Sequence, residues 1–502
     1  MSQRRYGAVL SYASLALNIA AAFILTPILV QMLGKGQFGL FSLMSSITAY
    51  FLLADLGLND TVLRYIVRYM RTSREDLGVF LGATMVGYAI VVTLMGIGSA
   101  IGYTFLDPQH WPKLTAQELD DFRFMYVIGL ASAGLVLLTN PVGALMAAHQ
   151  KFVAIQTLAI ATRLLSAVLI ILYLQFGHSV RTVFVLNNVV QASICLFEIA
   201  YVMFVIRPPF LLRPVSGAYV REKLSYAGPI LIVVLVEMIY WRLDNIIVGS
   251  MVGTAGLAVF SIGVLFQKHL EKLATTISKV WVPKLLAGLE TAHDPEATTM
   301  GVATIARLQL LIVLPVLGGV IFFGRDFLRL WLGAGFDGAW PIMLWTLIPY
   351  AIEVVGNVRN IILQVRGLYW RRAAAIIVFA ILNVVVTVVL VRRIGILGAA
   401  IGTGAGLICG YVYVQWLLWR RTEYRPALFY GALFRGIWIA IPQMAAVGFA
   451  LNLWPTANWV AFIAKAAIFS AAYALTVWLV GMNHTERGYF RSFAREARLA
   501  RP

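Results

Sequence analysis

The stretch LGKGQFGLFSL at residues 33–43 recurs without a gap as VGTAGLAVFSI at residues 252–262, an offset of 219 residues. Each copy joins two long apolar segments, and a looser echo pairs residues 146–152 with residues 363–369. An even number of apolar segments separates the two copies, so both should cross an apolar layer in the same direction. This pattern predicts a parallel repeat, whose halves are related by an axis along a membrane normal.

Apolar segments of membrane-spanning length dominate the chain. Apolar residues make up 61% of the 502 residues and charged residues only 12%, whereas soluble domains carry about 25% charged residues. Each transmembrane helix needs about 20 residues, and the alternating pattern of a membrane β-barrel is absent. The sequence therefore predicts an all-α, polytopic membrane protein with about 14 transmembrane helices. Their approximate ranges are 6–31, 37–58, 79–105, 122–147, 153–176, 182–206, 225–250, 255–276, 300–323, 340–364, 372–391, 396–419, 431–452 and 457–481.

Basic residues indicate the direction of these helices. The net charge is +18, and a cytoplasmic N-terminus places most Lys and Arg in inner turns, as the positive-inside rule requires. Because these charges punctuate apolar segments, they favour contact with anionic lipid head groups over nucleic acid. No small-residue cleavage site ends the first apolar segment, so we expect a helix there and not a signal peptide. Both termini are predicted to be cytoplasmic.

The repeat divides the chain into two pseudo-symmetric six-helix lobes. We predict an N-terminal lobe at 1–206, a polar, Pro-rich cytoplasmic linker at 207–224 and a C-terminal lobe at 225–420. Two further helices at 421–482 and a basic tail at 483–502, placed on the inner leaflet, complete the chain. Two similar lobes that face each other enclose a cleft that can open to either side, as alternating access requires.

Several motifs in this arrangement resemble those of a known family, the Wzx-type polysaccharide or O-antigen flippases. They belong to the multidrug/oligosaccharidyl-lipid/polysaccharide (MOP) exporter superfamily, which also holds multidrug exporters (MATE) and lipid II flippases. The motifs are residues 33–42, 55–58 and 63–66 near the N-terminus, 148–152 after the fourth helix, and 241–249 leading into Gly253 and Phe260.

The resemblance implies a V-shaped, fourteen-helix transporter in a bacterial inner membrane. Its cargo would be an undecaprenyl-diphosphate-linked oligosaccharide, moved from the cytoplasmic to the outer leaflet for O-antigen, exopolysaccharide or capsule synthesis. The implied partners are this cargo, membrane lipids, H⁺ or Na⁺, and other polysaccharide-assembly membrane proteins. No cofactor is expected, and Cys195 and Cys409 lack the spacing of a metal site or of a structural disulfide pattern.

Cations inside the predicted spans are the first candidate site residues. A charged side chain in the bilayer core is costly, so it usually faces a cavity or a partner. Lys268, Lys272 and Lys279 form one stripe on helix eight. Lys268 and Lys272 are predicted to bind the diphosphate, with snorkelling to the inner interface as the alternative, which we favour for Lys279.

Two arginines extend this predicted cargo site. Arg163 lies about eleven residues into helix five, roughly 17 Å along its axis. It should bind cargo or pair with Glu198 or Glu237. Arg307 lies near the inner end of helix nine, where it could line a vestibule or act as an interfacial anchor.

Acidic residues in the spans are candidates for ion coupling or gating, because a buried carboxylate can carry a proton. Glu237 and Asp244 share a face of helix seven, and Glu353 lies on helix ten with Asn357 and Asn360. Asp55 lies near the inner end of helix two. The alternative for each acid is a salt bridge, which for Asp55 would involve the neighbouring Arg64 and Arg68.

Other functions compete with flipping. A drug exporter of the same fold is the nearest alternative, although the central cations favour an anionic cargo. A lipid II flippase is a second alternative. A membrane glycosyltransferase, polymerase or ligase is not expected, since no sizeable outer loop, phosphate-binding glycine loop or paired-carboxylate motif is present.

Overall fold

The computed structural model describes residues 2–55, 58–222, 243–291, 294–482 and 486–487. Every regular element within these ranges is helical, which confirms the predicted all-α class. Ten described helices are long and apolar enough to cross a membrane, or eleven when the bent pair Pro426–Phe434 and Ile437–Asn452 is counted as one span. The chain is therefore a polytopic membrane protein, and the count of fourteen helices stays a prediction.

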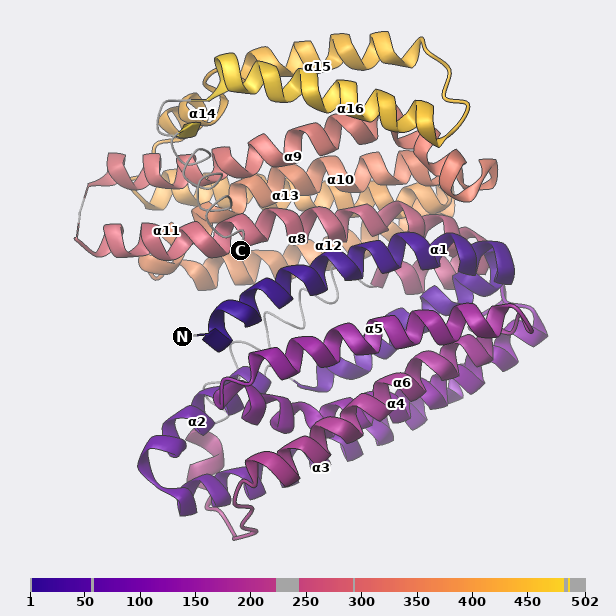
Figure 1. Ribbon diagram of the computed structural model, residues 1–502, viewed down its shortest axis with the longest axis vertical. Helices are drawn as coiled ribbons and strands as arrows, with labels where there is room; N and C mark the ends of the chain where they lie inside the picture. The colour runs from indigo at the N-terminus through magenta and orange to yellow at the C-terminus, as the bar shows by residue number, and fades with distance from the viewer. Residues whose placement is uncertain (1, 56–57, 223–242, 292–293, 483–485, 488–502) are drawn as a thin grey trace. The chain divides into compact units, whose positions relative to one another are not determined.

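The chain packs as two units, and unit 1 comprises Met1–Ser261 and Val391–Ala399. Figure 1 shows its helices side by side. Helix α3 packs on α4, α4 on α6, α6 on α5, and α5 on α1. A 3₁₀ turn follows α1, a π-helical turn follows α6, and the first residues of α8 also belong to this unit. The elements are α1 (Ser2–Phe51), η1 (Leu52–Asp55), α2 (Leu58–Thr72), α3 (Arg74–Thr104), α4 (Ala116–Ala148), α5 (Phe152–Leu174), α6 (Val180–Tyr201), η2 (Val202–Ile206) and α8 (Thr254–Thr291).

Unit 2 comprises Ile262–Leu390 and Ala400–Pro502. Its central helix is α9, which packs against α10, α14, α15 and α16. The elements are α9 (Pro295–Leu332), η3 (Ala334–Phe336), α10 (Ala339–Gly356), η4 (Asn357–Arg359), α11 (Asn360–Val365), α12 (Tyr369–Ile394), α13 (Ile396–Arg421), α14 (Pro426–Phe434), α15 (Ile437–Asn452), α16 (Trp459–Thr476) and η5 (Val477–Gly481).

The turns of the sequence repeat share a backbone conformation. Gly34 interrupts α1 with a φ of 79°, so α1 contains the first two predicted spans, and its repeat partner Gly253 has a φ of 98°. The second echo matches in the same way, because Gln150 has a φ of 58° and the equivalent Gly367 has a φ of 67°. Positive φ is uncommon outside glycine, so its recurrence at both offsets supports a structural repeat.

The short helix α2 was not predicted as a separate element. Charged residues interrupt the apolar residues of α2, but they recur at the three- to four-residue spacing of a helix. Val62, Tyr65 and Ile66 are buried, whereas Arg64 and Arg68 are exposed. This amphipathic pattern is typical of a helix that lies at a membrane surface.

The predicted linker follows the start of α3 as far as it is described. The backbone N–H of Leu211 donates to the carbonyl of Gly78 at 3.0 Å. A Cβ at position 82 would lie 2.3 Å from the Leu211 carbonyl oxygen, so Gly82 permits this close approach. Arg213 pairs with Glu75.

Most of the predicted tail at 483–502 and most of the predicted helix seven at 225–250 lie outside the described residues.

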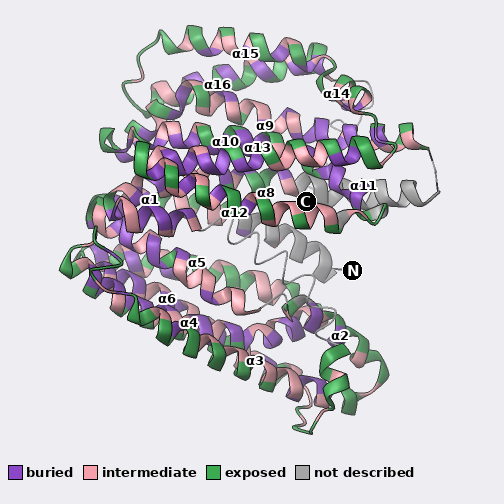
Figure 2. Ribbon diagram, turned by 180° about the vertical axis from the view of Figure 1, so that it is seen from behind, coloured by how far each residue is buried: buried purple, intermediate pink, exposed green. Residues whose placement is uncertain are grey.

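The outer face of α3 indicates which surface meets lipid. Its large apolar side chains at three- and four-residue intervals are more than half exposed: Ile90 54%, Leu94 62%, Ile97 57% and Ile101 60%. Figure 2 shows this exposed stripe along α3. A stripe of this kind is unfavourable in water, so we assign it to the hydrocarbon of the membrane.

Candidate functional site

The two copies of the repeat touch each other within unit 1. Gly39, in the second helical part of α1, lies so close to the start of α8 that a Cβ would stand 1.8 Å from the carbonyl oxygen of Thr254. A Cβ on Gly249 would lie 3.1 Å from Leu43. Because residue 39 meets backbone and not a flexible side chain, only glycine fits there.

Polar bonds reinforce this contact. The Asn245 side-chain amide donates to Ser46 Oγ at 2.7 Å, and both residues are buried. The Thr254 hydroxyl donates to Glu118 Oε1 at 2.6 Å, and Glu118 is itself held by a capping box at the start of α4. We call this contact the repeat seal and define it by Gly39, Ser46, Glu118, Asn245 and Thr254. It lies towards the side that the charge pattern predicts to be outer.

Asp55 is the centre of a polar cluster at the other end of unit 1. The Tyr88 hydroxyl donates to Asp55 Oδ1 at 2.6 Å, and the Asn140 side-chain amide donates to the same oxygen at 2.7 Å. The backbone N–H of Asn59 approaches Oδ2 at 3.3 Å. The carboxylate therefore links η1 to α3 and α4, and Asn140 directly precedes Pro141 within α4.

The predicted pairing of Asp55 with Arg64 and Arg68 is wrong in this structure. In the described parts of the chain no Lys or Arg forms an ion pair with Asp55. Arg64 and Arg68 lie on the exposed side of α2, because burial of the apolar side turns them away. The sequence did not reveal Tyr88 as a partner, although Asn140 carried a signal as a polar residue before a proline in an apolar span.

Arg163 is exposed on α5, halfway along a helix of 23 residues. Its Nε donates to Asn18 Oδ1 on α1 at 2.7 Å, and Asn18 donates to the Ser14 carbonyl at 2.8 Å. Among described residues no carboxylate pairs with Arg163, and Glu198 is not its partner. Glu237, the other predicted partner, lies outside the described residues. The observed partner of this mid-helix cation is thus a neutral amide.

The predicted lysines lie on α8 in unit 2. Lys268 and Lys272 are exposed, one turn apart, on the same side of the helix. The backbone of α8 continues through Lys279, whose side chain is outside the described part of the structure. The helical spacing on which the stripe depends is therefore present.

Arg307 lies elsewhere, in a buried bonding network of unit 2. Only 2% of Arg307 is exposed, and its Nε donates to Glu486 Oε1 at 2.6 Å. Its other nitrogens donate to backbone carbonyls of Ala432, Leu433, Arg435 and Gly481. Protein groups enclose the guanidinium, so Arg307 has a structural role in place of the predicted cargo contact.

The other predicted acids differ in burial and belong to different units. Asp244 is 6% exposed in unit 1, whereas Glu353 is half-buried on α10 in unit 2. Asn357 and Asn360 follow Glu353 along the chain, and the Asn360 side-chain amide donates to Asn357 Oδ1. These two predicted neighbours are therefore brought together.

Arg359 is a buried cation to which the sequence assigned no role. It is 1% exposed, and its Nε donates to the Gly356 carbonyl at 2.8 Å. The guanidinium lies 4.5 Å from the Tyr411 ring centroid and 5.3 Å from that of Phe429, and it donates to Gln415. Aromatic faces thus stabilise this charge. They come from α13 and α14, which sequence spacing alone does not bring to α10.

Comparison with known proteins identifies similar chains and similar folds. A family model described as "Polysaccharide biosynthesis protein" matches residues 7–287. The "Uncharacterized membrane protein EpsK" of Bacillus subtilis (strain 168) is 24% identical over 338 residues, and the match covers 65% of this chain and 65% of EpsK. The chain thus spans slightly less than two thirds of that relative's length.

Two solved structures have the same helical arrangement. A lipid II flippase MurJ in an inward closed conformation superimposes with a TM-score of 0.70 at 14% identity, covering 94% of this chain and 97% of that chain. An inward-facing multidrug resistance MATE family transporter of the MOP superfamily gives a TM-score of 0.58 at 14% identity, covering 79% of this chain and 94% of that chain. At these identities the likeness establishes the fold.

Proposed function

The chain belongs to the polysaccharide biosynthesis protein family, and from that premise we propose that it flips a lipid-linked oligosaccharide across the bacterial inner membrane. The cargo is an undecaprenyl-diphosphate-linked glycan, carried from the cytoplasmic to the outer leaflet for cell-surface polysaccharide synthesis. The chain acts as a transporter and not as an enzyme. The fold it shares with a lipid II flippase and a MATE transporter supports transport.

One observation carries this proposal: Arg163 lies in mid-helix, exposed, and bonded to the neutral Asn18. A charge at this depth is costly in hydrocarbon, so it should face an aqueous or polar path. A diphosphate needs strong donors when it leaves water. Arg163 supplies two further guanidinium nitrogens for that purpose, and Lys268 and Lys272 are the proposed additional cargo contacts.

The repeat seal supports alternating access. A backbone contact joins Gly39 of the first repeat copy to Thr254 of the second, and two hydrogen bonds flank it, one from Asn245 to Ser46 and one from Thr254 to Glu118 of α4. Opening the seal would expose the path to the outer side, and rupture of a few bonds is within the free energy that cargo or ion binding can supply.

Substitution of the cargo-binding cations tests the function. A strain that lacks its own polysaccharide flippase should regain surface polysaccharide when it expresses this chain. Arg163→Ala and Lys268→Ala should each reduce export about tenfold or more, because truncating one partner of a desolvated charged contact costs about 2–5 kcal/mol. Arg163→Lys should retain part of the activity.

The matched control is Arg392→Ala, which removes an exposed arginine at the end of α12. It should export at the wild-type rate. Failure of the wild-type chain in several such strains, with resistance to cationic drugs gained instead, would identify a drug exporter. Rescue of lipid II translocation alone would identify a lipid II flippase.

Asp55 is the proposed coupling or gating residue that the geometry supports best, and Glu237, Asp244 and Glu353 remain proposals for the same role. The Asp55 carboxylate accepts hydrogen bonds from two neutral donors, Tyr88 and Asn140. Such an acid can bind H⁺ or Na⁺ without breaking an ion pair. Binding of a cation would weaken the bonds that join η1 to α3 and α4.

Asp55→Asn should keep the fold, since an amide oxygen can accept the same two hydrogen bonds. Export should fall sharply, because the neutral amide cannot take up H⁺ or Na⁺ in place of the carboxylate, and its dependence on external pH should be lost. Export measured across a pH series checks both. Asp294→Asn is the control, because Asn caps the start of α9 as well as Asp does. A wild-type pH profile in Asp55→Asn would reduce Asp55 to a structural role.

A further inference from the structure

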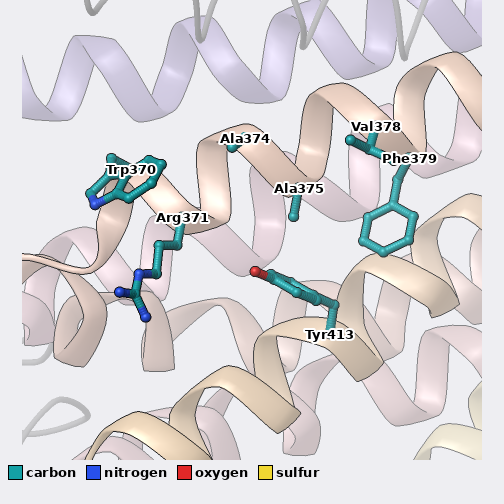
Figure 3. A pocket seen from close by; sticks show the side chains of 7 residues that line it. All are labelled: Trp370, Arg371, Ala374, Ala375, Val378, Phe379 and Tyr413. Carbon is teal, nitrogen blue, oxygen red and sulfur yellow. The ribbon is translucent and has the colours of Figure 1, made fainter.

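A groove between α12 and α13 lies on the surface of unit 2 (Figure 3). Its volume is about 450 Å³, and its middle is lined by small and apolar side chains. The lining residues are Trp370, Arg371, Ala374, Ala375, Val378, Phe379 and Tyr413. Val378 is 62% exposed and Trp370 67% exposed, so the groove opens to the surroundings of the helices.

The groove has one cationic end. Figure 3 shows Trp370 and Arg371 at one end and Val378 and Phe379 at the other. The Arg371 guanidinium lies 5.9 Å from the Trp370 ring centroid. Within the described residues no carboxylate forms an ion pair with Arg371. Its charge is thus available to a ligand that enters the groove.

More aromatic and basic residues gather at the same end. Thr387 lies beside Gly402 and the Phe379 ring lies 6.0 Å from that of Tyr413, so α12 and α13 run antiparallel and the start of α12 lies beside the end of α13. Arg420 and Arg421 end α13, and Arg420 lies 4.9 Å from the Trp419 ring centroid. Exposed Trp with surplus Arg is typical of the cytoplasmic membrane interface. Basic pockets between helices on that side bind anionic lipid head groups.

The dimensions of the groove favour a lipid of one leaflet. From Trp370 to Val378 the helix rises about 12 Å, less than half of the roughly 30 Å hydrocarbon core. An acyl chain fits this depth, with a phosphate at Arg371 and the chain along Ala374, Ala375 and Val378. A cargo that must cross the whole membrane would need contacts well beyond it.

We infer that the groove between α12 and α13 binds an anionic phospholipid of the inner leaflet, with its phosphate at Arg371. Phosphatidylglycerol is the probe that tests this. The purified full chain, in micelles containing phosphatidylglycerol and phosphatidylcholine with matched acyl chains, should retain phosphatidylglycerol in preference by native mass spectrometry. Arg371→Gln should weaken its retention about fivefold, since one basic residue contributes about 1 kcal/mol near an anionic surface.

Filling the groove gives a second variant. Val378→Trp should remove the bound phosphatidylglycerol, whereas Val412→Trp, at a similarly exposed valine of α13 (58%) outside the groove, should leave it. Thermal unfolding of each variant checks that the fold is kept. Unchanged phosphatidylglycerol retention in both Arg371→Gln and Val378→Trp would overturn the proposal. Displacement of undecaprenyl phosphate but not of phosphatidylglycerol by Val378→Trp would also overturn it, because the groove would then bind the cargo. Neither result bears on whether the chain flips oligosaccharide.

Discussion

Arg307→Ala is expected to destabilise unit 2 strongly. The variant would remove the Arg307 guanidinium from the carboxylate of Glu486, which is 3% exposed, and would orphan the backbone carbonyls that now accept from that guanidinium. Breaking a buried ion pair from one side costs about 3–5 kcal/mol. The loss should appear as a sharply lower unfolding temperature and low accumulation in the membrane.

The position of Arg307 explains the size of this effect. Its acceptors include Leu433 and Arg435, which flank the 49° bend between α14 and α15, and Gly481 at the end of η5. One side chain thus fixes a broken helix and the end of the last span to α9. Glu486→Gln should be milder, because the carbonyl acceptors remain.

A surface pair on the same helix provides the control. Arg329, which is 47% exposed, pairs with Asp337 at 2.6 Å, and its hydrogen bond, with that of Arg325, lowers the pKa of Asp337. Exposed pairs contribute about 0–1 kcal/mol, so Arg329→Ala should change the unfolding temperature little. Equal losses in Arg307→Ala and Arg329→Ala would contradict the structural role of Arg307.

Gly39→Val is expected to keep the repeat seal open and to reduce export about tenfold. Its Cβ would meet the Thr254 carbonyl oxygen at 1.8 Å, so the two copies must separate. Overpacking of this kind costs about 1–3 kcal/mol, which is enough to shift a closed state towards an open one by about tenfold. Export in the complementation assay measures the loss.

Accessibility separates an open seal from a damaged fold. Thr254 is 5% exposed, so a Thr254→Cys variant should react slowly with an impermeant maleimide added outside. A Cys409→Ser background removes the exposed native thiol. Gly39→Val should speed this labelling, whereas Gly87→Val, where a Cβ meets nothing within 4 Å, should not. Unchanged labelling and export in Gly39→Val would argue against the seal.

The fold could be predicted largely from the sequence because hydropathy and repeats are local signals. Fourteen apolar segments predicted helices, and α13 (Ile396–Arg421) matches the predicted range 396–419 closely. By contrast, α8 (Thr254–Thr291) and α9 (Pro295–Leu332) run well beyond the predicted ranges 255–276 and 300–323. The turn at Gly34 and its partner at Gly253 were predicted from the repeat alone. The amphipathic α2 was missed because its mean hydropathy is low, although its helical period was present.

The site was less predictable, since charge partners depend on packing between distant segments. Arg163 was identified by depth, but its partner Asn18 lies 145 positions away. Arg307 was predicted to meet cargo and is instead enclosed by carbonyls from two distant stretches, 432–435 and Gly481, and by the Glu486 carboxylate, which spacing does not reveal. Asp55 was predicted beside Arg64 and Arg68 by sequence distance, whereas the fold brings Tyr88 and Asn140 to it.

The most direct measurement of the central claim is translocation in proteoliposomes. Fluorescent undecaprenyl-diphosphate oligosaccharide would be placed in both leaflets, and a membrane-impermeant quencher would report its exchange between them. Wild-type protein should make the protected fraction of the label accessible to the quencher, and Arg163→Ala should slow that exchange about tenfold or more. Exchange equal to that of protein-free liposomes, or equal in wild type and Arg163→Ala, would contradict the claim that this chain carries a lipid-linked anion past Arg163.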